Sequence, residues 1–251
     1  MEVIIKNTVE EMSKLGAEIV ADVIKSKPNP ILGLATGSTP VKMYSELIKM
    51  NKAGTLDFKN VRSFNLDEYV GLEGTHDQSY RYFMNFNLFD HVNIDKKNTN
   101  VPNGIAKDIP AACAEYEKKI KDWGGIDIQV LGIGSNGHSA FNEPLSGGMT
   151  RTRKVSLTES TIKDNARMFA KIEDVPRFAV SMGIGTINEA RKIILLANGK
   201  NKAAAIAAAV EGPITQMCPS SFLQLHADVI FVVDKDAASM LKGKYPTEYV
   251  K

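Results

Sequence analysis

The residues best suited to chemistry lie in the stretch IDIQVLGIGSNGHSAFNEP, at positions 126–144. An apolar run from Ile126 to Leu131 is followed by a glycine-rich turn, and then by His138 and Glu143 within one short irregular segment. This pattern predicts a buried strand that delivers polar side chains to the carboxyl edge of a parallel sheet, where open α/β sheets bind their ligands. Because an unperturbed imidazole titrates near pH ~6.5, an imidazole oriented by a carboxylate is a workable proton shuttle near neutral pH.

A second polar segment follows the predicted strand 31–35 and precedes a helix that begins near Pro40. Its members are Thr36, Gly37, Ser38 and Thr39. Free backbone N–H groups and the helix dipole at such a position favour an anion, and the hydroxyls add donors. An ordinary strand–helix turn with Ser/Thr capping explains the segment equally well, so the residues alone leave both interpretations open.

Two carboxylates, Asp67 and Glu68, follow the predicted strand 61–66 and are placed at the same edge of the sheet. One of them is a candidate base, although a solvated strand end is the favoured interpretation of the pair taken alone. Acid–base chemistry on a small phosphorylated molecule is the function that combines this carboxylate, the histidine–glutamate pair and the anion loop.

Other chemistries fit the sequence less well. Gly132, Gly134 and Gly137 spell the dinucleotide-binding motif GxGxxG, but Pro144 interrupts the helix that the third glycine should open. The phosphate-loop sequence GxxxxGK[ST], the zinc-binding sequence HExxH and the nucleophile sequence GxSxG are missing, so no metal site is expected. The remaining histidines are isolated: His76, His91 and His226.

Composition and charge narrow the class of protein. The chain has 251 residues, 43% hydrophobic and 24% charged, which is ordinary for a globular protein with a sizeable core. The net charge of +2 is close to balance, and no basic stripe points to nucleic acid or a membrane surface as a partner. The two cysteines lack redox or metal-binding spacing. No signal peptide is recognisable and no apolar run approaches the ~20 residues of a membrane helix, so a cytoplasmic protein is expected.

Predicted strands and helices alternate along the chain. We expect strands at 3–5, 31–35, 61–66, 126–131, 178–182, 193–197 and 228–233, and helices at 9–25, 40–48, 109–123, 158–169, 187–191, 202–210 and 237–241. Thr8 is the expected N-cap of the first helix, and Glu11 completes a capping box. Residues 75–94 are predicted to form a helix plus loop and residues 145–156 an exposed loop. The alternation predicts a single-domain α/β fold over 1–251, a doubly wound, mainly parallel sheet with helices on both faces.

Several segments together resemble one known family. LGLATGSTP, FNLDEYVGL, LGIGSNGHSAFNEP, RTR, NARMF, GKNKAAAIAAAVEG and LQLHADVI occur in the order found in glucosamine-6-phosphate deaminases. The resemblance implies conversion of glucosamine 6-phosphate and water to fructose 6-phosphate and ammonia in amino-sugar catabolism, without a metal or organic cofactor. It also implies a modified Rossmann-like sheet shared with sugar-phosphate isomerases and lactonases.

The resemblance gives a role to each matching position. Asp67 matches the base that moves a proton between C2 and C1 of the open-chain sugar. His138 matches the acid that opens the ring, and Glu143 the carboxylate that orients this histidine. Asn136 belongs to the same catalytic group. The positions that match the cradle of the substrate phosphate are Thr36, Gly37, Ser38, Thr39, Arg167 and Lys202.

Two positions depart from the family pattern. Asn136 stands where many members carry an aspartate, although asparagine also occurs, so the histidine loses one negative neighbour. Arg153 matches a residue that binds N-acetylglucosamine 6-phosphate in hexameric members, but Val155 replaces the lysine of that site, and the sequence stops at Lys251, without the longer tail that carries a tyrosine. We therefore expect little or no activation by this sugar phosphate. A monomer and a homo-oligomer both stay open.

Two rival functions share parts of this pattern. A 6-phosphogluconolactonase would have the same sheet and phosphate loop, but a different sequence where FNEP stands here. A sugar-phosphate sensor without turnover would use the same fold, yet it would not need Asp67, His138 and Glu143 together. Release of ammonia separates the deaminase from both rivals.

Overall fold

Seven short parallel strands form the centre of the computed structural model, which describes residues 1–167 and 169–250. Their order across the sheet is β1-β10-β9-β6-β2-β3-β5, and every neighbouring pair runs parallel. The strands are β1 (Glu2–Lys6), β2 (Ile31–Leu34), β3 (Arg62–Asn65), β5 (Thr99–Asn100), β6 (Ile128–Leu131), β9 (Lys192–Ala197) and β10 (Val229–Asp234). Strands β2, β6 and β10 are buried at every position, as expected when both faces of a sheet are covered.

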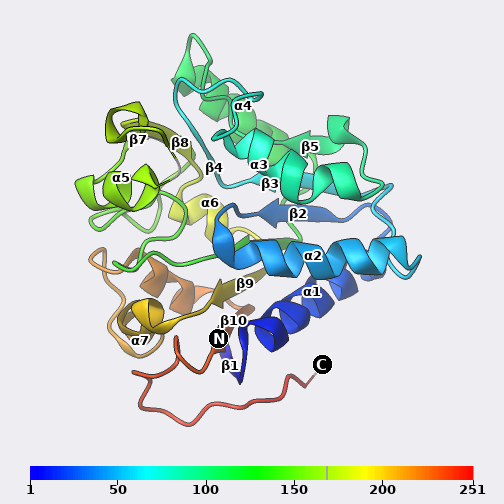
Figure 1. Cartoon of the computed structure of the whole chain (residues 1–251), viewed down its shortest axis with the longest axis vertical. Coiled ribbons are helices and arrows are strands. Elements are labelled where there is room, and N and C mark those ends of the chain that lie inside the picture. Colours follow the sequence, from blue (N-terminus) through cyan, green and yellow to red (C-terminus); the bar gives the residue numbers. More distant parts are fainter. Residues whose placement is uncertain (168, 251) are drawn as a thin grey trace.

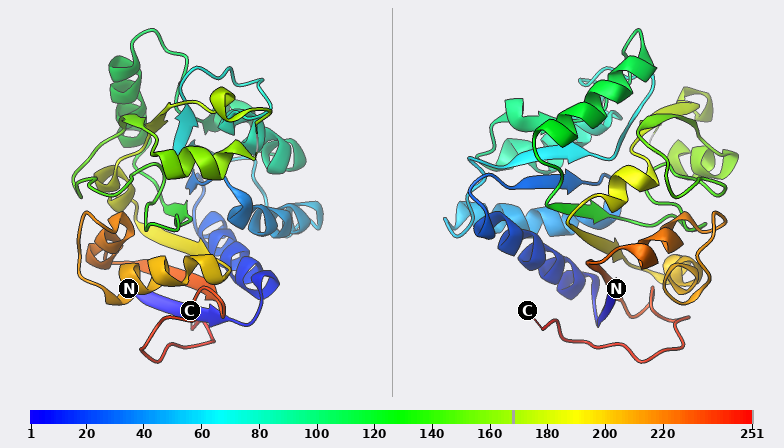
Figure 2. Two further views of the ribbon diagram at one scale, coloured as in Figure 1. Left: turned by 60° about the vertical axis from the view of Figure 1, so that its left-hand side comes forward. Right: turned by 180° about the vertical axis from the view of Figure 1, so that it is seen from behind.

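Helices pack against both faces of this sheet (Figures 1 and 2). Helices α1 (Val9–Ser26) and α2 (Ser38–Lys52) lie side by side on one face. Helix α4 (Ile109–Asp122) covers the other, where its Tyr116 ring meets Phe64 of β3 edge-on at 5.4 Å. The remaining helices are α3 (Tyr80–Asn87), α5 (Glu159–Ala166), α6 (Ile184–Asn188) and α7 (Ala203–Glu211), with 3₁₀ turns η1 (Phe89–His91), η2 (Lys96–Asn98), η3 (Ile172–Asp174), η4 (Lys200–Lys202) and η5 (Pro219–Leu225). The predicted fold class is confirmed.

A small antiparallel sheet lies beyond the carboxyl ends of the parallel strands, on the left of Figure 1. It consists of β4 (Asp67–Tyr69), β8 (Phe178–Ser181) and β7 (Arg153–Ser156). The prediction of a solvated strand end at Asp67 is therefore wrong, because that residue starts a buried strand. The prediction of an exposed loop over 145–156 is wrong in its last four residues. This short edge strand resembles a basic loop in sequence because it carries exposed Lys154. The Lys154 ammonium lies 4.2 Å from the centre of the Phe178 ring.

Two predicted helices are displaced or missing. Residues 235–240 form turns instead of the closing helix, and the Asp234 carboxylate accepts the N–H of Ala237 at the start of these turns. The helix expected at 187–191 lies earlier, in α6, directly after β8. The first helix agrees with its prediction, since the Thr8 hydroxyl accepts the N–H of Glu11 at 3.1 Å.

The strand order creates a switch point between β2 and β6. After β2 the chain builds outward through β3 and β5, and then returns to the other side of β2 to form β6, β9 and β10. The loops after β2 and β6 therefore leave neighbouring strands in opposite directions and open a crevice at the carboxyl edge. These are the loop 35–37, which leads into α2, and the loop 132–143.

Candidate active site

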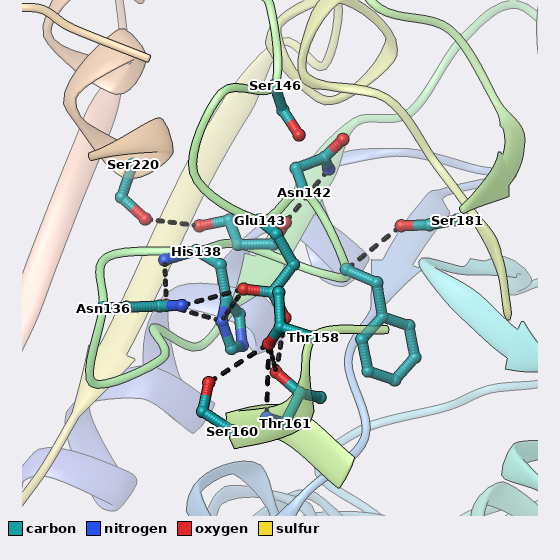
Figure 3. A network of polar contacts seen from close by, with 12 residues as sticks. Asn136, His138, Asn142, Glu143, Ser146, Thr158, Ser160, Thr161, Ser181 and Ser220 are labelled. Atoms are coloured by element: carbon teal, nitrogen blue, oxygen red, sulfur yellow. Dashed lines mark hydrogen bonds and ion pairs between the residues drawn. The ribbon is translucent and has the colours of Figure 1, made fainter. Parts of the chain in front are cut away.

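His138, Asn136 and Glu143 contact one another after β6 (Figure 3). The imidazole Nδ1 lies 2.7 Å from Asn136 Oδ1 and 3.3 Å from Glu143 Oε2. The Asn136 amide donates to the same carboxylate oxygen at 2.8 Å. Since both neighbours of Nδ1 are acceptors, Nδ1 carries a proton, and Nε2 is the nitrogen left to exchange a proton with a ligand.

The backbone of this loop is shaped to seat the imidazole. A Cβ atom on Gly134 would lie 2.2 Å from His138 Cε1, so the second glycine of GxGxxG makes room for the histidine ring and not for a dinucleotide. Ala140 has a φ of 53°, a strained value for a residue with a side chain, of the kind that often accompanies functional sites. Buried Asn142 fixes the loop by donating to the carbonyls of Ser139 and Met182.

Glu143 is buried and ionised. The residue is 7% exposed, and burial alone would raise the pKa of its carboxyl group. The hydrogen bond and charge of His138 outweigh that cost and, with Thr161 and Asn136, lower the pKa of Glu143 to about 2. Thr161 belongs to helix α5, and Thr158 is the N-cap of that helix. The carboxylate is thus an acceptor in permanent contact with the imidazole.

Asp67 lies on the other side of the switch point, on β4, and is only 6% exposed. Burial, and then the charge of neighbouring Glu68, raise the pKa of Asp67 to about 8. Glu68 holds the N-terminus of α3 by accepting the N–H groups of Tyr80 and Arg81 at 2.9 and 3.0 Å. A carboxyl group that gains and loses a proton close to neutral pH is suited to act as a base.

Strand β8 connects the Asp67 strand with the histidine loop. Ser181 is paired with Asp67 across the antiparallel ladder, and its hydroxyl accepts the N–H of Phe141 at 3.1 Å. Met182 donates to the carbonyl of Leu66 at 2.7 Å. Asp67 and the loop that carries His138 and Glu143 are therefore fixed to the same short strand, at the same edge of the main sheet.

The loop after β2 leads directly into the N-terminus of α2. Gly37 is the N-cap of α2 with a φ of 99°, a conformation that favours glycine, and it offers no capping side chain to the N-terminal N–H groups. Ser38 begins the helix and Thr36 precedes this turn. Thr39 donates to Asn198 at 3.1 Å, which joins this loop to the segment after β9.

The two predicted cations come from different elements. Lys202 ends η4, directly after the segment that contacts Thr39, so it belongs to the same edge. Arg167 is exposed at the C-cap of α5, whose first turn contacts Glu143. Sequence reasoning missed Asn142, Thr158, Thr161 and Ser181. The only available signal was the Thr158-x-x-Thr161 spacing at a helix start.

Two hollows lie at the opposite edge of the sheet, where the strands begin. They measure about 380 and 190 Å³ and adjoin each other at Lys27 and Pro28. The second is bordered by buried Asp127, which is paired with Lys27 at 2.5 Å and with Arg191 at 2.9 Å. Two cations therefore neutralise this buried carboxylate, and the hollows lie at the edge of the sheet away from His138 and Glu143.

A buried carboxyl group, a histidine–glutamate pair and the N-terminus of a helix lie at the carboxyl edge of a parallel sheet, where enzymes of the open α/β class bind their ligands. A sequence model of the family described as "Glucosamine-6-phosphate isomerases/6-phosphogluconolactonase" matches residues 5–231. The chain belongs to this family.

Three known proteins show how close the similarity is. The glucosamine-6-phosphate deaminase of Shewanella woodyi is 55% identical over 244 residues, 97% of this chain and 92% of that protein. The solved structure of a monomeric glucosamine-6-phosphate deaminase has a TM-score of 0.94 and 44% identity, covering 96% of this chain and 100% of that one. The 6-phosphogluconolactonase of Trypanosoma cruzi has a TM-score of 0.75 at 22% identity, over 96% and 97% of the two chains, and shares the fold alone.

No cluster of three or more His, Cys, Asp or Glu side chains able to hold a metal was found in residues 1–167 and 169–250. Within the same part of the chain, none of the helices has the length and apolar character needed to cross a membrane.

Proposed function

We propose that this protein converts glucosamine 6-phosphate and water to fructose 6-phosphate and ammonia. The observation that carries the proposal is the pairing of His138 with Glu143 at the switch point. This pair lies at the same edge of the main sheet as buried Asp67. Two relatives that share 55% and 54% sequence identity with this chain are glucosamine-6-phosphate deaminases, and this similarity supports the same reaction here. Because a sugar phosphate does not cross membranes unaided, the cytoplasm is the proposed compartment.

The phosphate serves as the anchor in this proposal. The N–H groups at the start of α2, that of Thr39 among them, and the hydroxyl of Ser38 bind its oxygens, and Lys202 and Arg167 add positive charge. The Thr39 hydroxyl donates to Asn198 and holds this segment in place. The role of the anchor is to fix the sugar so that its C1–C2 end reaches the acid and the base, which is the positional part of catalysis.

His138 opens the ring. Its imidazolium gives the Nε2 proton to the ring oxygen and the ring C1–O bond breaks. The C1 hydroxyl then gives its proton to the freed Nε2, which leaves an aldehyde at C1 and restores the imidazolium. Glu143 holds Nδ1–H and favours the charged imidazole during this step. The step needs no group beyond the imidazole, its carboxylate and the substrate.

Asp67 then moves the proton of the sugar carbon. Its carboxylate takes the C2 proton and returns it to C1, while one proton passes from the ammonium group to the C1 oxygen, so that the amino aldehyde becomes a C2 iminium ion with a C1 hydroxyl. Water adds at C2, its protons pass to the nitrogen, and the C2–N bond breaks to release ammonium and leave the ketone. The ammonium group of the bound substrate favours the ionised form of Asp67, whose pKa is about 8 in the free enzyme.

A coupled assay for ammonia and fructose 6-phosphate tests the proposal. Wild-type protein should form both products in equal amounts, and Asp67→Asn should lower kcat by about 100-fold or more because the base is lost. Hydrolysis of 6-phosphogluconolactone without ammonia release would favour the lactonase instead. Binding of glucosamine 6-phosphate without either product would favour the sensor.

A further inference from the structure

The two oxygens of the Glu143 carboxylate have separate partners (Figure 3). Oε2 faces His138 and Asn136, the pair that takes part in proton transfer. Oε1 accepts a hydrogen bond from the hydroxyl of Thr161 and a longer one, at 3.3 Å, from that of Thr158. Both threonines belong to the first turn of α5, so this helix holds the oxygen that faces away from the imidazole.

The direction of the Thr161 hydrogen bond follows from its partner. An ionised carboxylate can only accept, so the single hydroxyl proton of Thr161 points at Oε1. Thr158 has other uses for its hydroxyl, because it also accepts the N–H of Thr161 at 3.3 Å and lies 3.0 Å from the Thr161 hydroxyl. Thr161, at 6% exposure, is the main buried donor to Oε1.

Helix α5 is fixed to the site on two further sides. Ile162, next to Thr161, is buried in a small apolar cluster with Tyr69 and Phe141, two residues before Glu143. One turn further along, Asn165 donates to the Tyr69 hydroxyl at 2.8 Å. The hydroxyl of Thr161 is therefore held in place relative to both Phe141 and the strand that carries Asp67.

We infer that Thr161 is a positioning residue for the acid–base pair: its hydroxyl holds Oε1 and turns Oε2 toward His138. Without this donor, Oε1 would be a buried carboxylate oxygen left with one long hydrogen bond, and desolvation would raise the pKa of Glu143. The inference rests on the proposed function for its kinetic consequence, and on the Glu143 contacts alone for its electrostatic one.

The test compares wild type with Thr161→Val, which removes the hydroxyl and keeps the shape. The pKa of Glu143, about 2 in wild type, should rise when followed by NMR of the side-chain carboxyl carbon. The groups that face this carboxylate are the imidazole of His138, the amide of Asn136 and the two threonine hydroxyls, so the imidazole is the one titrating neighbour to follow in parallel. We expect kcat to fall about tenfold with little change in KM, since a lost hydrogen bond to a charged group is worth about one factor of ten.

Two variants separate positioning from folding. Thr161→Ser restores the hydroxyl and should return both the Glu143 pKa and kcat toward wild type. Ser160→Ala changes an exposed neighbour on the same turn that bonds Thr158 and not Glu143, so it should leave both values unchanged. An unaltered Glu143 pKa in Thr161→Val overturns the inference, whatever the activity. Absence of ammonia release by wild type would instead overturn the proposed function and leave the NMR result decisive.

Discussion

The side-chain amide of Asn136 donates to Glu143 Oε2 at 2.8 Å, and it is this neutral group that bridges the carboxylate and the imidazole. Its oxygen accepts from His138 Nδ1 at 2.7 Å, so one amide satisfies both neighbours at once. An aspartate at this position would keep the contact with the imidazole but would face Glu143 with a second carboxylate. The amide therefore removes a like-charge contact and, with it, one negative charge beside the histidine.

Asn136→Asp should move the alkaline limb of the pH–rate profile to higher pH. The added negative charge favours the imidazolium that gives its proton to the ring oxygen, so the active form persists further into the alkaline range. The measurement is kcat/KM for ammonia release against pH. Asn136→Ala is the matched control, because it removes the same hydrogen bonds without adding charge. If the aspartate and alanine variants share one alkaline limb, the charge argument is wrong.

Asp67→Asn should make the substrate-free protein more stable than wild type at alkaline pH. The folded-state pKa of Asp67, about 8, lies above the value near 3.9 of an exposed aspartate, so ionisation is costly in the fold. The protonated carboxyl is compatible with the fold below pH ~4, and wild type loses stability as pH rises from there through about 8. Asparagine never ionises and avoids this loss.

The check is the melting temperature of both proteins at several pH values. The variant should match wild type near pH 4 and exceed it increasingly toward pH 9, with a difference in unfolding free energy of a few kcal/mol, since each pH unit is worth about 1.4 kcal/mol. A constant difference across the range would mean that Asp67 is not a buried ionising group.

Glu68→Gln should move the acid limb of kcat/KM to lower pH. The charge of Glu68 is the second cause of the raised Asp67 pKa, so its removal lowers that pKa, while burial keeps it above the ordinary range. Because the base must be ionised, the variant should gain activity at acid pH relative to its own plateau. It should also lose about 1–3 kcal/mol of stability, since its amide nitrogen would face a backbone N–H of α3. An acid limb at the wild-type position would assign it to another group.

Much of the fold follows from local sequence. The runs ending at Leu34 and Leu131 are short, apolar and followed by turns that contain glycine, which specifies buried parallel strands and places the next residues at one edge. The candidate residues Asp67, His138 and Glu143 could be chosen for this reason, since the carboxyl ends of parallel strands are neighbours in any such sheet.

What the sequence does not reveal depends on partners far along the chain. Asp67–Tyr69 is a strand only because residues 179–181 pair with it. No local sequence pattern predicts a three-residue strand that contains two acidic residues. Thr161 becomes part of the site only because α5 packs on Phe141. Such contacts are tertiary, and propensity carries no record of them.

Activation by N-acetylglucosamine 6-phosphate should be weak or absent. Arg153 uses its guanidinium within the chain, with Asn142 Oδ1 at 2.9 Å and the Ser146 hydroxyl at 3.4 Å. Val155 packs against the apolar cluster next to α5, and its side chain carries no charge to bind a phosphate. A phosphate bound beside Arg153 would therefore contact a single cation, and that guanidinium is already hydrogen-bonded to the loop that carries Glu143.

Initial rates against glucosamine 6-phosphate concentration should therefore be hyperbolic, with and without the acetylated sugar phosphate. If the acetylated compound occupies the active site through its phosphate, it should raise the apparent KM without changing kcat, which is the opposite of activation. A sigmoidal curve that the compound converts to a hyperbola would show that Arg153 suffices for an effector site. In that case Arg153→Ala should abolish the conversion, because the two global states required by allostery would differ in their contact with that cation.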